Sequence, residues 1–486
     1  MLKLKDPSLF KQQVYVAGEW IDADSGKTVA VTNPANGEQL GTVPMCGKSE
    51  TERAIVAADL AQRSWRERPA KDRSTVLRRL NDLMLSNADD LALIMTAEQG
   101  KPLAEAKGEI AYAASFIEWF AEEARRVYGD TIPAAQGDKR ILAIKQPVGT
   151  TAAITPWNFP TAMLTRKAGP ALAAGCSMVV KPATLTPFSA LAFAELAVRA
   201  GVPPGLLSVL TGSSSEIGGE MTRNPLVRKL SFTGSTEIGR TLMRQSADTI
   251  KKLSLELGGN APFIVFDDAD LDAAFEGAMV SKYRNTGQTC VCANRIYVQR
   301  GVLKSFSDKL VAKVKALKVG PGTEEGVTQG PLIDDKALAK IEEHIADARA
   351  KGGEVLTGGK RHALGGQFFE PTVLTGATRE MLVAKEETFG PLAPIFAFDS
   401  EDEVIAQAND TEFGLAAYFY SRDIGRVMRV AERLESGIVG VNTGLISTAE
   451  APFGGVKQSG LGREGSKYGL DDYLEIKYIC LGGIDK

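Results

Sequence analysis

The stretch LSFTGSTEIG, residues 230–239, has the pattern of a buried strand, a tight turn and the start of a helix. Gly234 has no side chain, so the backbone at the turn can come close to a ligand. A helix that begins at Ser235 would present free N–H groups, which suit a phosphate. The glycine spacing is Gly-x-x-x-x-Gly rather than the dinucleotide fingerprint Gly-x-Gly-x-x-Gly. Taken alone, the stretch is therefore equally compatible with an ordinary strand-to-helix turn.

Short apolar runs alternate with helical stretches on both sides of this turn. Such alternation predicts an α/β fold with a parallel sheet. Residues 1–130 are expected to be mainly helical after a short β arm at 15–20, and Ser49 is expected to cap the first helix. The candidate strands are 151–154, 178–180, 207–210, 229–232 and 263–266, and the early helical stretches are 49–66, 71–86 and 103–127.

Two further segments, residues 140–145 and 473–480, look like strands that stand outside this series. An unpaired apolar strand at the end of a chain would promote aggregation. We therefore expect these segments to pair across a subunit boundary rather than at an edge within the chain.

Composition narrows the class of protein. A chain of 486 residues is too long to fold around one hydrophobic core, so two or three domains are expected. A formal net charge of −3 without blocks of like charge argues against nucleic acid or an anionic membrane as partner. The N-terminus lacks a signal-peptide core, and five cysteines spread over the chain do not form a disulfide framework. A cytoplasmic location is expected.

Two stretches supply a nucleophile and a base. Cys290 lies in NTGQTCVC, residues 285–292, and Glu256 lies in SLELGGN, residues 254–260. A lone cysteine is often a small core residue, and a lone glutamate is often solvated. Histidine is scarce, since His344 falls in a charged helical stretch where it should be solvated, and His362 falls in a surface turn. A histidine-based dyad or a His/Cys metal site is thus poorly supplied, so a carboxylate base and no metal are expected.

Two more stretches end predicted strands. Lys181 follows the apolar run 178–180, at the carboxyl end where parallel sheets bind ligands, although it could equally be a surface lysine. Asn158 lies in PWNFP, residues 156–160, where flanking prolines would make a rigid loop. Its amide could face a developing oxyanion, or the loop could simply pack on the core.

Taken together, these motifs resemble the aldehyde dehydrogenase superfamily over residues 10–482. The motifs that carry the resemblance, in family order, are PWNFP (156–160), KPA (181–183), FTGS (232–235), LELGG (255–259), GQTC (287–290), ETFGP (387–391) and PFGG (452–455). The stretches YRNTGQTCVCANR (283–295) and GLGREGSKYG (460–469) resemble the bacterial succinate-semialdehyde dehydrogenases within that superfamily, with glutarate-semialdehyde dehydrogenases nearly as similar.

The resemblance implies a covalent mechanism. Cys290 would attack the aldehyde as thiolate, and the Asn158 amide and the Cys290 N–H would hold the oxyanion. Hydride would leave for a nicotinamide cofactor, and Glu256 would then activate the water that hydrolyses the thioester. The residues matched to the cofactor site are Pro156, Trp157, Lys181, Ala183, Thr184, Phe232, Gly234, Ser235, Leu257, Glu387 and Phe389.

The fold implied by the resemblance has two α/β domains with open sheets and a small β flap for oligomerisation. The expected boundaries are 1–132 with 150–257 for the dinucleotide-binding domain, 258–468 for the catalytic domain, and 133–149 with 469–486 for the flap. The two segments without sheet partners fall in this flap. A homo-oligomer is implied, either a dimer or a tetramer built as a dimer of dimers.

Cofactor and substrate preferences follow from single positions. Relatives that prefer NAD commonly have Glu where this chain has Thr184, so NADP is expected in preference to NAD. Arg166, Arg284 and Ser447 match positions that hold the remote carboxylate of a semialdehyde, a task to which arginine is suited. Succinate semialdehyde is the expected substrate, with glutarate semialdehyde as the alternative, because one methylene discriminates weakly.

Cys292, two residues after the nucleophile, has two interpretations. It could be a small side chain packed under the loop, or it could form a reversible disulfide with Cys290 under oxidation. Two other functional classes also remain. A thiol hydrolase would not need Lys181 or the 232–235 turn. An inactive structural relative would lack the nucleophile, and the presence of Cys290, Glu256 and Asn158 together argues against it.

Overall fold

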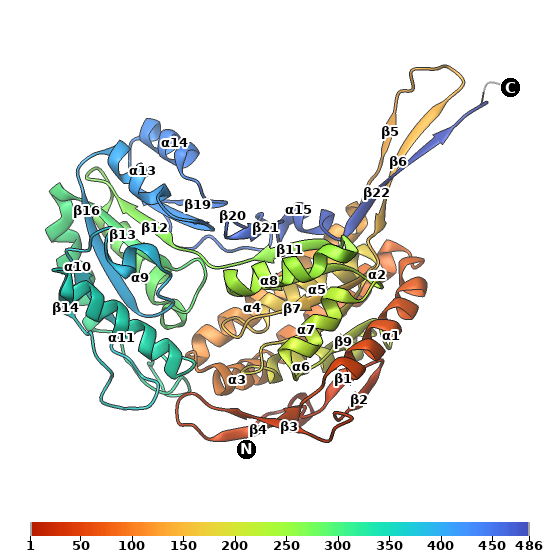
Figure 1. The fold of residues 1–486 in the computed structure, drawn as a ribbon, viewed down its shortest axis with the longest axis horizontal. Helices are drawn as coiled ribbons and strands as arrows, with labels where there is room; N and C mark the ends of the chain where they lie inside the picture. The colour runs from red at the N-terminus through yellow and green to blue at the C-terminus, as the bar shows by residue number, and fades with distance from the viewer. Residues whose placement is uncertain (1, 485–486) are drawn as a thin grey trace.

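The computed structural model, which describes residues 2–484, contains two α/β lobes side by side and a thin β arm that projects from one of them (Figure 1). The first lobe is built on an eight-stranded sheet with the order β2-β1-β9-β8-β7-β10-β11-β21. Its strands are β1 Val14–Val16, β2 Glu19–Ile21, β7 Thr150–Ile154, β8 Ser177–Lys181, β9 Leu207–Val209, β10 Val227–Thr233, β11 Lys252–Glu256 and β21 Gly460–Leu461.

The centre of this sheet is parallel and its edges are antiparallel. Alternate residues of its strands enter two different cores, one containing Ala152 and Val179 and the other Ala153 and Val180. A strand whose two faces are both covered must be apolar throughout, which explains the uninterrupted apolar runs of the sequence. The flanking helices are α1 Lys48–Arg66, α2 Ala70–Ser86, α3 Ala88–Gln99, α4 Leu103–Glu123, α5 Ala162–Ala174, α6 Phe188–Ala200, α7 Ser214–Arg223 and α8 Thr236–Ser246.

The second lobe has a seven-stranded sheet with the order β14-β15-β16-β13-β12-β18-β19, in which only the β14 pairing is antiparallel. Its strands are β12 Ala261–Val265, β13 Ala293–Gln299, β14 Glu354–Thr357, β15 Thr372–Thr375, β16 Leu392–Phe398, β18 Ala416–Tyr420 and β19 Ile438–Val441. Its helices are α9 Leu271–Tyr283, α10 Leu303–Lys315, α11 Asp335–Ala350, α12 Leu382–Lys385, α13 Glu401–Asn409 and α14 Ile424–Arg433. Helices α9 and α10 pack on one face, and α11, α13 and α14 on the other.

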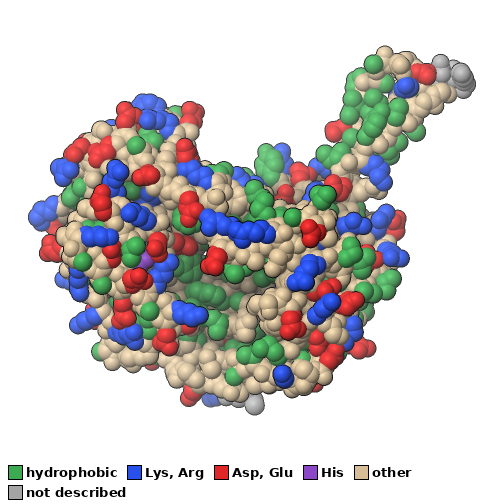
Figure 2. Space-filling view, viewed as in Figure 1, with side chains coloured by type: hydrophobic (Ala, Val, Ile, Leu, Met, Phe, Trp, Pro, Cys, Tyr) green, Lys and Arg blue, Asp and Glu red, His purple; other side chains and the backbone are tan. Residues whose placement is uncertain are grey.

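Smaller elements join and extend the lobes. The hairpin of β3 Thr28–Thr32 and β4 Gln39–Pro44 runs along the lower edge of Figure 1. The remaining elements are β17 Phe413–Gly414, β20 Val456–Lys457, α15 Ser466–Asp471 and the short 3-10 helices Pro7–Leu9, Ala124–Arg126, Ala247–Thr249, Arg284–Gly287 and Arg300–Val302. No helix within residues 2–484 is both long and apolar enough to cross a membrane. Figure 2 shows a hollow between the lobes in which hydrophobic side chains are visible.

The projecting arm corrects one expectation from the sequence. Its strands are β5 Asp130–Ile132, β6 Arg140–Pro147 and β22 Leu474–Leu481. Strands β6 and β22 pair antiparallel with each other along their whole length. The two segments therefore pair with each other within one chain, which corrects the expectation that neither has a sheet partner in its own chain. Strand β22 lies at the edge of this three-stranded sheet, and pairing across a subunit boundary stays a prediction. The pairing of β6 with β22 leaves Ile476 and Tyr478 of β22 74% and 64% exposed.

Two local expectations also need correction. The first helix begins after Gly47, and the Glu50 carboxylate accepts a hydrogen bond from the Gly47 N–H at 2.9 Å, so Ser49 is not its cap. Helix α3 was not predicted from the sequence. The β5 strand enters the arm sheet before residue 133, and β21 joins the first sheet although it lies beyond residue 257. The division of the chain into domains stays a prediction.

Candidate active site

A cavity of about 210 Å³ at the junction of the lobes collects most of the predicted site. Cys290, Glu256 and Asn158 all line it. The other lining residues are Pro156, Trp157, Met163, Thr233, Gly234, Ser235, Leu257, Gly258, Glu387 and Phe389. Lys181, Ala183, Thr184 and Phe232, which were also predicted at the cofactor site, are not in the wall of this cavity.

The parallel register explains why these residues meet. In β10 and β7, Phe232 pairs with Ile154, and in β10 and β11, Thr233 pairs with Glu256. The carboxyl ends of these strands therefore share one edge of the sheet, where open α/β sheets bind ligands. Lys181 ends β8 at the same edge. The second lobe contributes Cys290 from the loop that precedes β13.

Asn158 and the nucleophile loop contact each other directly. The Asn158 side-chain amide donates a hydrogen bond to the Gln288 carbonyl oxygen at 3.0 Å. An amide carries two N–H groups, so one remains to face an oxyanion beside Cys290. The loop itself is strained, because Asn285 and Thr286 have φ of 50° and 56°. Gly287 has φ of 75°, and a Cβ there would lie 2.2 Å from the Gly390 carbonyl oxygen.

The thiol of Cys290 is protonated in this environment. Burial raises the pKa of Cys290 to about 12, and the Glu387 carboxylate adds to the rise, whereas Arg166 and Arg284 oppose it. A thiol with that pKa needs a base before it can attack a carbonyl carbon.

Glu256 fits the role of this base. It is 3% exposed, and neither carboxylate oxygen has a hydrogen-bond partner among the described residues. Burial and the neighbouring Glu464 carboxylate raise the pKa of Glu256 well above its usual value, and Arg166 and Lys167 partly oppose the rise. A carboxylate with a raised pKa is a stronger base, and its free oxygens face the cavity.

Glu464 was not predicted as a site residue. Its carboxylate forms ion pairs with Arg166 Nε at 2.9 Å and with Lys167, and the cations hold its pKa below the usual range. The segment that contains Glu464 was quoted only for its family resemblance. Nothing in the sequence indicated that it would return beside Glu256, more than 200 residues earlier in the chain.

The turn after β10 can receive a phosphate group. Ser235 caps α8, and its hydroxyl oxygen accepts a hydrogen bond from the Ile238 N–H at 3.5 Å. A Cβ on Gly234 would lie 2.5 Å from the Phe232 ring, so a larger residue there would have to displace that ring. Lys181 is 4% exposed, and burial lowers its pKa to about 8. A buried lysine at the strand end is suited to a hydroxyl or phosphate oxygen.

The opposite wall is the segment that contains Glu387 and Phe389. A Glu387 carboxylate oxygen accepts a hydrogen bond from the Gly259 N–H at 3.2 Å, and burial raises the pKa of Glu387 to about 7. Phe389 has φ of 55° and meets Trp157 edge to face, with ring centroids 5.6 Å apart. These residues fit a nicotinamide nucleotide between a helix N-terminus and a strained loop.

His344 supports this segment, which corrects its predicted position. It is fully buried on α11, and its Nδ1 lies 3.0 Å from the Thr388 hydroxyl oxygen. Burial and the charge of Lys340 lower its pKa. The alternation of charged and apolar residues in 335–350 indicated the helix correctly, but it could not show that the loop of the second lobe covers this face.

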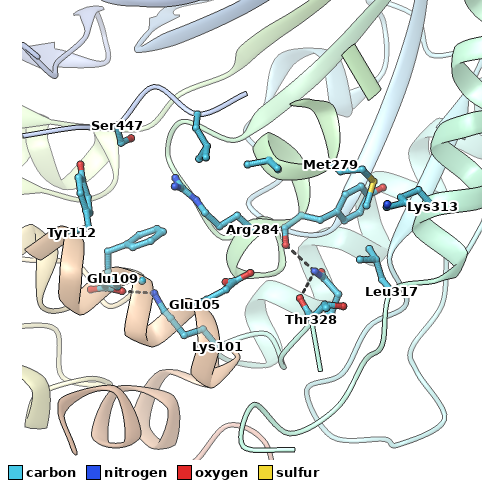
Figure 3. Close-up of a pocket in the computed structure, with 16 residues that line it drawn as sticks. Lys101, Glu105, Glu109, Tyr112, Met279, Arg284, Lys313, Leu317, Thr328 and Ser447 are labelled. Atoms are coloured by element: carbon cyan, nitrogen blue, oxygen red, sulfur yellow. Dashed lines mark hydrogen bonds and ion pairs between the residues drawn. The ribbon is translucent and has the colours of Figure 1, made fainter. Parts of the chain in front are cut away.

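A second cavity of about 520 Å³ contains two of the three predicted carboxylate contacts (Figure 3). Arg284 and Ser447 line it. Figure 3 shows the Arg284 guanidinium directed towards the side where Tyr112 and Ser447 lie. The Tyr112 hydroxyl is buried without a hydrogen-bond partner among residues 2–484. Tyr112 was not predicted, because a tyrosine on a helix is ordinarily a packing residue.

Arg166, the third predicted contact, lies elsewhere. It is 1% exposed, pairs with Glu464, and stacks over the Phe453 ring with 3.9 Å between guanidinium carbon and ring centroid. Cys292 is also buried, and its thiol donates to the Lys282 carbonyl oxygen at 3.4 Å. Whether it pairs with Cys290 stays a prediction.

Comparison with known proteins identifies the family of this chain. The sequence pattern of the aldehyde dehydrogenase family matches residues 20–479. The chain belongs to the aldehyde dehydrogenase family. The glutarate-semialdehyde dehydrogenase of Pseudomonas aeruginosa is 70% identical over 483 residues, which are 99% of this chain and all of that protein. The NADP⁺ succinate-semialdehyde dehydrogenase of Escherichia coli K12 is 67% identical over 481 residues, again 99% of this chain and all of that protein.

Solved structures show the same fold as this chain. A crystal structure of succinate-semialdehyde dehydrogenase from Burkholderia pseudomallei superposes with a TM-score of 0.98 at 68% identity, covering 99% of this chain and 100% of that one. The predicted α/β fold of this aldehyde dehydrogenase is thereby confirmed. Within the described residues, no group of His, Cys, Asp and Glu side chains could hold a metal ion.

Proposed function

We propose that this aldehyde dehydrogenase oxidises succinate semialdehyde to succinate with NADP. One observation carries the proposal. The Cys290 thiol, the Glu256 carboxylate and the Asn158 side-chain amide line the same cavity, and the Glu256 carboxylate has no hydrogen-bond partner among the described residues. These groups suit nucleophilic attack, proton removal and oxyanion binding, respectively. A thiol hydrolase would use the same three groups, but it would have no use for the helix N-terminus at Ser235 or for the strained Phe389 wall.

The chain's own residues supply most of the chemistry. Glu256 takes the proton of the Cys290 thiol, and the thiolate attacks the aldehyde carbon to form a C–S bond and an oxyanion. The free Asn158 N–H and the Cys290 N–H hold that oxyanion, and one such donor typically contributes about 3–4 kcal/mol to the transition state. When bound, the nicotinamide cofactor accepts the hydride that leaves the substrate carbon. After it has released the thiol proton to solvent, Glu256 removes a proton from the water that attacks the thioester carbon. The C–S bond breaks, Glu256 returns this second proton to the Cys290 thiolate, and the product leaves as a carboxylate once its own acid proton has passed to solvent.

NADP is the proposed cofactor, with NAD as an alternative. Thr184 lies half-buried just beyond β8 and adds no negative charge, while Lys181 adds a positive one. The Escherichia coli relative is named as an NADP⁺ enzyme. A 2′-phosphate near Lys181 would therefore meet attraction without carboxylate repulsion.

The substrate is proposed to place its carboxylate in the second cavity. Arg284 and Ser447 line that cavity, and the unpartnered Tyr112 hydroxyl offers a third donor. The Arg284 guanidinium lies 5.4 Å from the centroid of the Phe159 ring in the same cavity wall, where its charge can pair with a substrate carboxylate. The relatives are named for both succinate and glutarate semialdehyde, and glutarate semialdehyde is the alternative substrate.

We further propose that the arm of β5, β6 and β22 joins subunits into a dimer or a dimer of dimers. The support is the exposed apolar surface at Ile476 and Tyr478, which would be costly on an isolated subunit. The predicted division into a dinucleotide-binding domain, a catalytic domain and this flap is proposed with it.

Steady-state rates test the proposal. Purified enzyme is assayed by the ultraviolet absorbance of reduced cofactor, with succinate semialdehyde, glutarate semialdehyde and an uncharged aldehyde of equal length, each with NADP and NAD. We expect the highest kcat/KM for succinate semialdehyde with NADP, and no activity in Cys290→Ala. An equal kcat/KM for the uncharged aldehyde would refute the carboxylate site, and activity without cofactor would favour the hydrolase.

A further inference from the structure

A buried ion pair lies in the wall of the second cavity (Figure 3). Lys101, between α3 and α4, is 1% exposed, and Glu109, on α4, is 3% exposed. Lys101 Nζ and Glu109 Oε2 are 2.5 Å apart. Because two charges lose their hydration on burial, such a pair is weak evidence for stability by itself. Its further contacts indicate what it does.

Both members hold the backbone of the segment that contains Asn158. Lys101 Nζ donates a hydrogen bond to the Asn158 carbonyl oxygen at 2.7 Å. On the other side of the ion pair, Glu109 Oε1 accepts hydrogen bonds from the Thr161 N–H at 3.0 Å and the Ala162 N–H at 3.2 Å. These N–H groups open α5 and have no acceptor within the helix. The ion pair thus grips residues 158–162 at both ends.

The same carbonyl oxygen is tied to the nucleophile loop. Asn285 Nδ2 donates to the Asn158 oxygen at 3.0 Å, and Gln99 Nε2 donates to Asn285 Oδ1 at 3.1 Å. The Asn158 amide in turn donates to Gln288. The Asn158 backbone therefore receives two donors, one from each lobe, and its side chain bridges to the loop before Cys290.

Two of the three N–H donors of Lys101 are already used within the protein. Besides Glu109 and Asn158, its ammonium lies 4.0 Å from the centroid of the Phe159 ring, within cation–π distance. Its position in a cavity wall would otherwise make it a candidate for the substrate carboxylate. The occupied donors point instead to an internal task.

We propose that the Lys101–Glu109 pair is a positioning device that aims the Asn158 amide at the oxyanion. This proposal rests on the oxyanion role proposed above for Asn158. The pair acts through the backbone of residues 158–162 and does not touch the substrate. Small displacements of a group that stabilises a transition state are costly, since a shift of about 1 Å can lower the rate about 100-fold.

A double-mutant cycle tests the proposal. Lys101→Met, Asn158→Ala and the double variant are compared with the wild-type enzyme in kcat, KM and NADP affinity by fluorescence titration. We expect Asn158→Ala to lower kcat about 100- to 1,000-fold, as removal of one oxyanion donor does. Lys101→Met should lower kcat about 10- to 100-fold with NADP affinity unchanged, and its further effect in the Asn158→Ala background should be less than about threefold.

The controls separate the possible failures. Lys107→Met removes an exposed lysine of α4, the helix that carries Glu109; Lys107 pairs with Asp89 at 2.8 Å, and this variant should leave kcat unchanged. Equal losses from Lys101→Met in both backgrounds would overturn the positioning role, and a raised KM for charged semialdehydes alone would mean that Lys101 binds substrate. A loss below about tenfold in Asn158→Ala would instead refute the oxyanion assignment. If Lys101→Met does not fold, Glu109→Gln replaces it in the same cycle. The amide oxygen of the new glutamine can still accept a hydrogen bond from the Thr161 N–H, whereas the ion pair with Lys101 is lost.

Discussion

Replacing Thr184 with glutamate should convert the enzyme from NADP to NAD preference. Thr184 lies half-buried in the segment that follows β8, three residues after Lys181. The Lys181 ammonium is almost fully buried, and burial lowers its pKa to about 8. Among residues 2–484 it donates only to the Pro182 carbonyl oxygen, at 3.3 Å. A carboxylate at position 184 would compete for that ammonium and would also repel a 2′-phosphate.

The size of the effect follows from Coulomb's law. Two unit charges about 4 Å apart repel by about 4 kcal/mol at an effective dielectric of about 20. Solvent reaches the half-exposed position 184, so screening should leave about 1.5–3 kcal/mol, which corresponds to about 10- to 100-fold in kcat/KM for NADP. NAD carries no 2′-phosphate, and its ribose hydroxyls can donate hydrogen bonds to the new carboxylate. Its kcat/KM should therefore stay level or rise.

The assay compares kcat/KM for both cofactors in the wild-type enzyme, Thr184→Glu and Thr184→Gln at fixed pH and two salt concentrations. Glutamine has the size of glutamate without its charge. We expect a large change in the NADP to NAD ratio for glutamate, reduced at high salt, and little change for glutamine. Equal losses of NADP activity in both variants would show that shape rather than charge controls the choice, and the reasoning would be refuted. A wild-type preference for NAD of about tenfold or more, close to 1.4 kcal/mol, would refute the NADP proposal itself.

Three further predictions concern the substrate, the base and oxidation. Arg284→Met should raise KM for succinate semialdehyde about 10- to 100-fold, which corresponds to the loss of one charge-assisted hydrogen bond, and should leave KM for an uncharged aldehyde unchanged. Equal effects on both substrates would contradict the carboxylate contact. Because burial and the Glu464 charge raise the pKa of Glu256, and the base works deprotonated, kcat should rise with pH through that pKa, and Glu464→Gln should shift this limb to lower pH; an unshifted limb would contradict the coupling. Peroxide should inactivate the enzyme reversibly if Cys292 pairs with Cys290, and Cys292→Ala should make the loss harder to reverse; peptide mapping without a Cys290–Cys292 linkage would leave Cys292 as packing.

The sequence predicted the fold best where local pattern and tertiary environment agree. Strands β7, β8, β9 and β10 of the first sheet were found because both of their faces are buried, so their sequences are largely apolar. Strands β11 and β21 of the same sheet were not among the candidates. Helix α3 was missed although nine of its twelve residues are buried, from Asp90 to Gln99. A helix buried on nearly all sides lacks the polar stripe by which periodicity is recognised.

The arm and His344 show a different limit. Residues 140–147 and 474–481 pair over eight residue pairs, yet more than 320 positions separate them in the chain. Each strand alone looks unpartnered, because only the closed topology brings them together. His344 lies on a helix with a charged pattern, but the loop at Thr388 covers it. Both errors arise because burial by a distant segment leaves no local mark in a sequence.

The site was predictable residue by residue but not in its electrostatics. Family motifs indicated Cys290, Glu256 and Asn158, which the fold brings to one cavity. They did not indicate that burial and a second carboxylate, Glu464, together raise the pKa of Glu256. The cause is again separation, since more than 200 residues lie between the two carboxylates in the chain, and the antiparallel pairing of β21 with β11 brings both segments to the first sheet.

Helix α5 joins the two halves of the proposed mechanism. Its first turn is held by Glu109, beside the Asn158 segment that would stabilise the oxyanion. One turn later, Arg166 and Lys167 bind Glu464 and thereby limit how far the pKa of Glu256 rises. A displacement of this helix would disturb the attack on the aldehyde and the hydrolysis of the thioester together. Variants that loosen α5 should therefore slow both steps, whereas variants of the cavity residues themselves should slow one step more than the other.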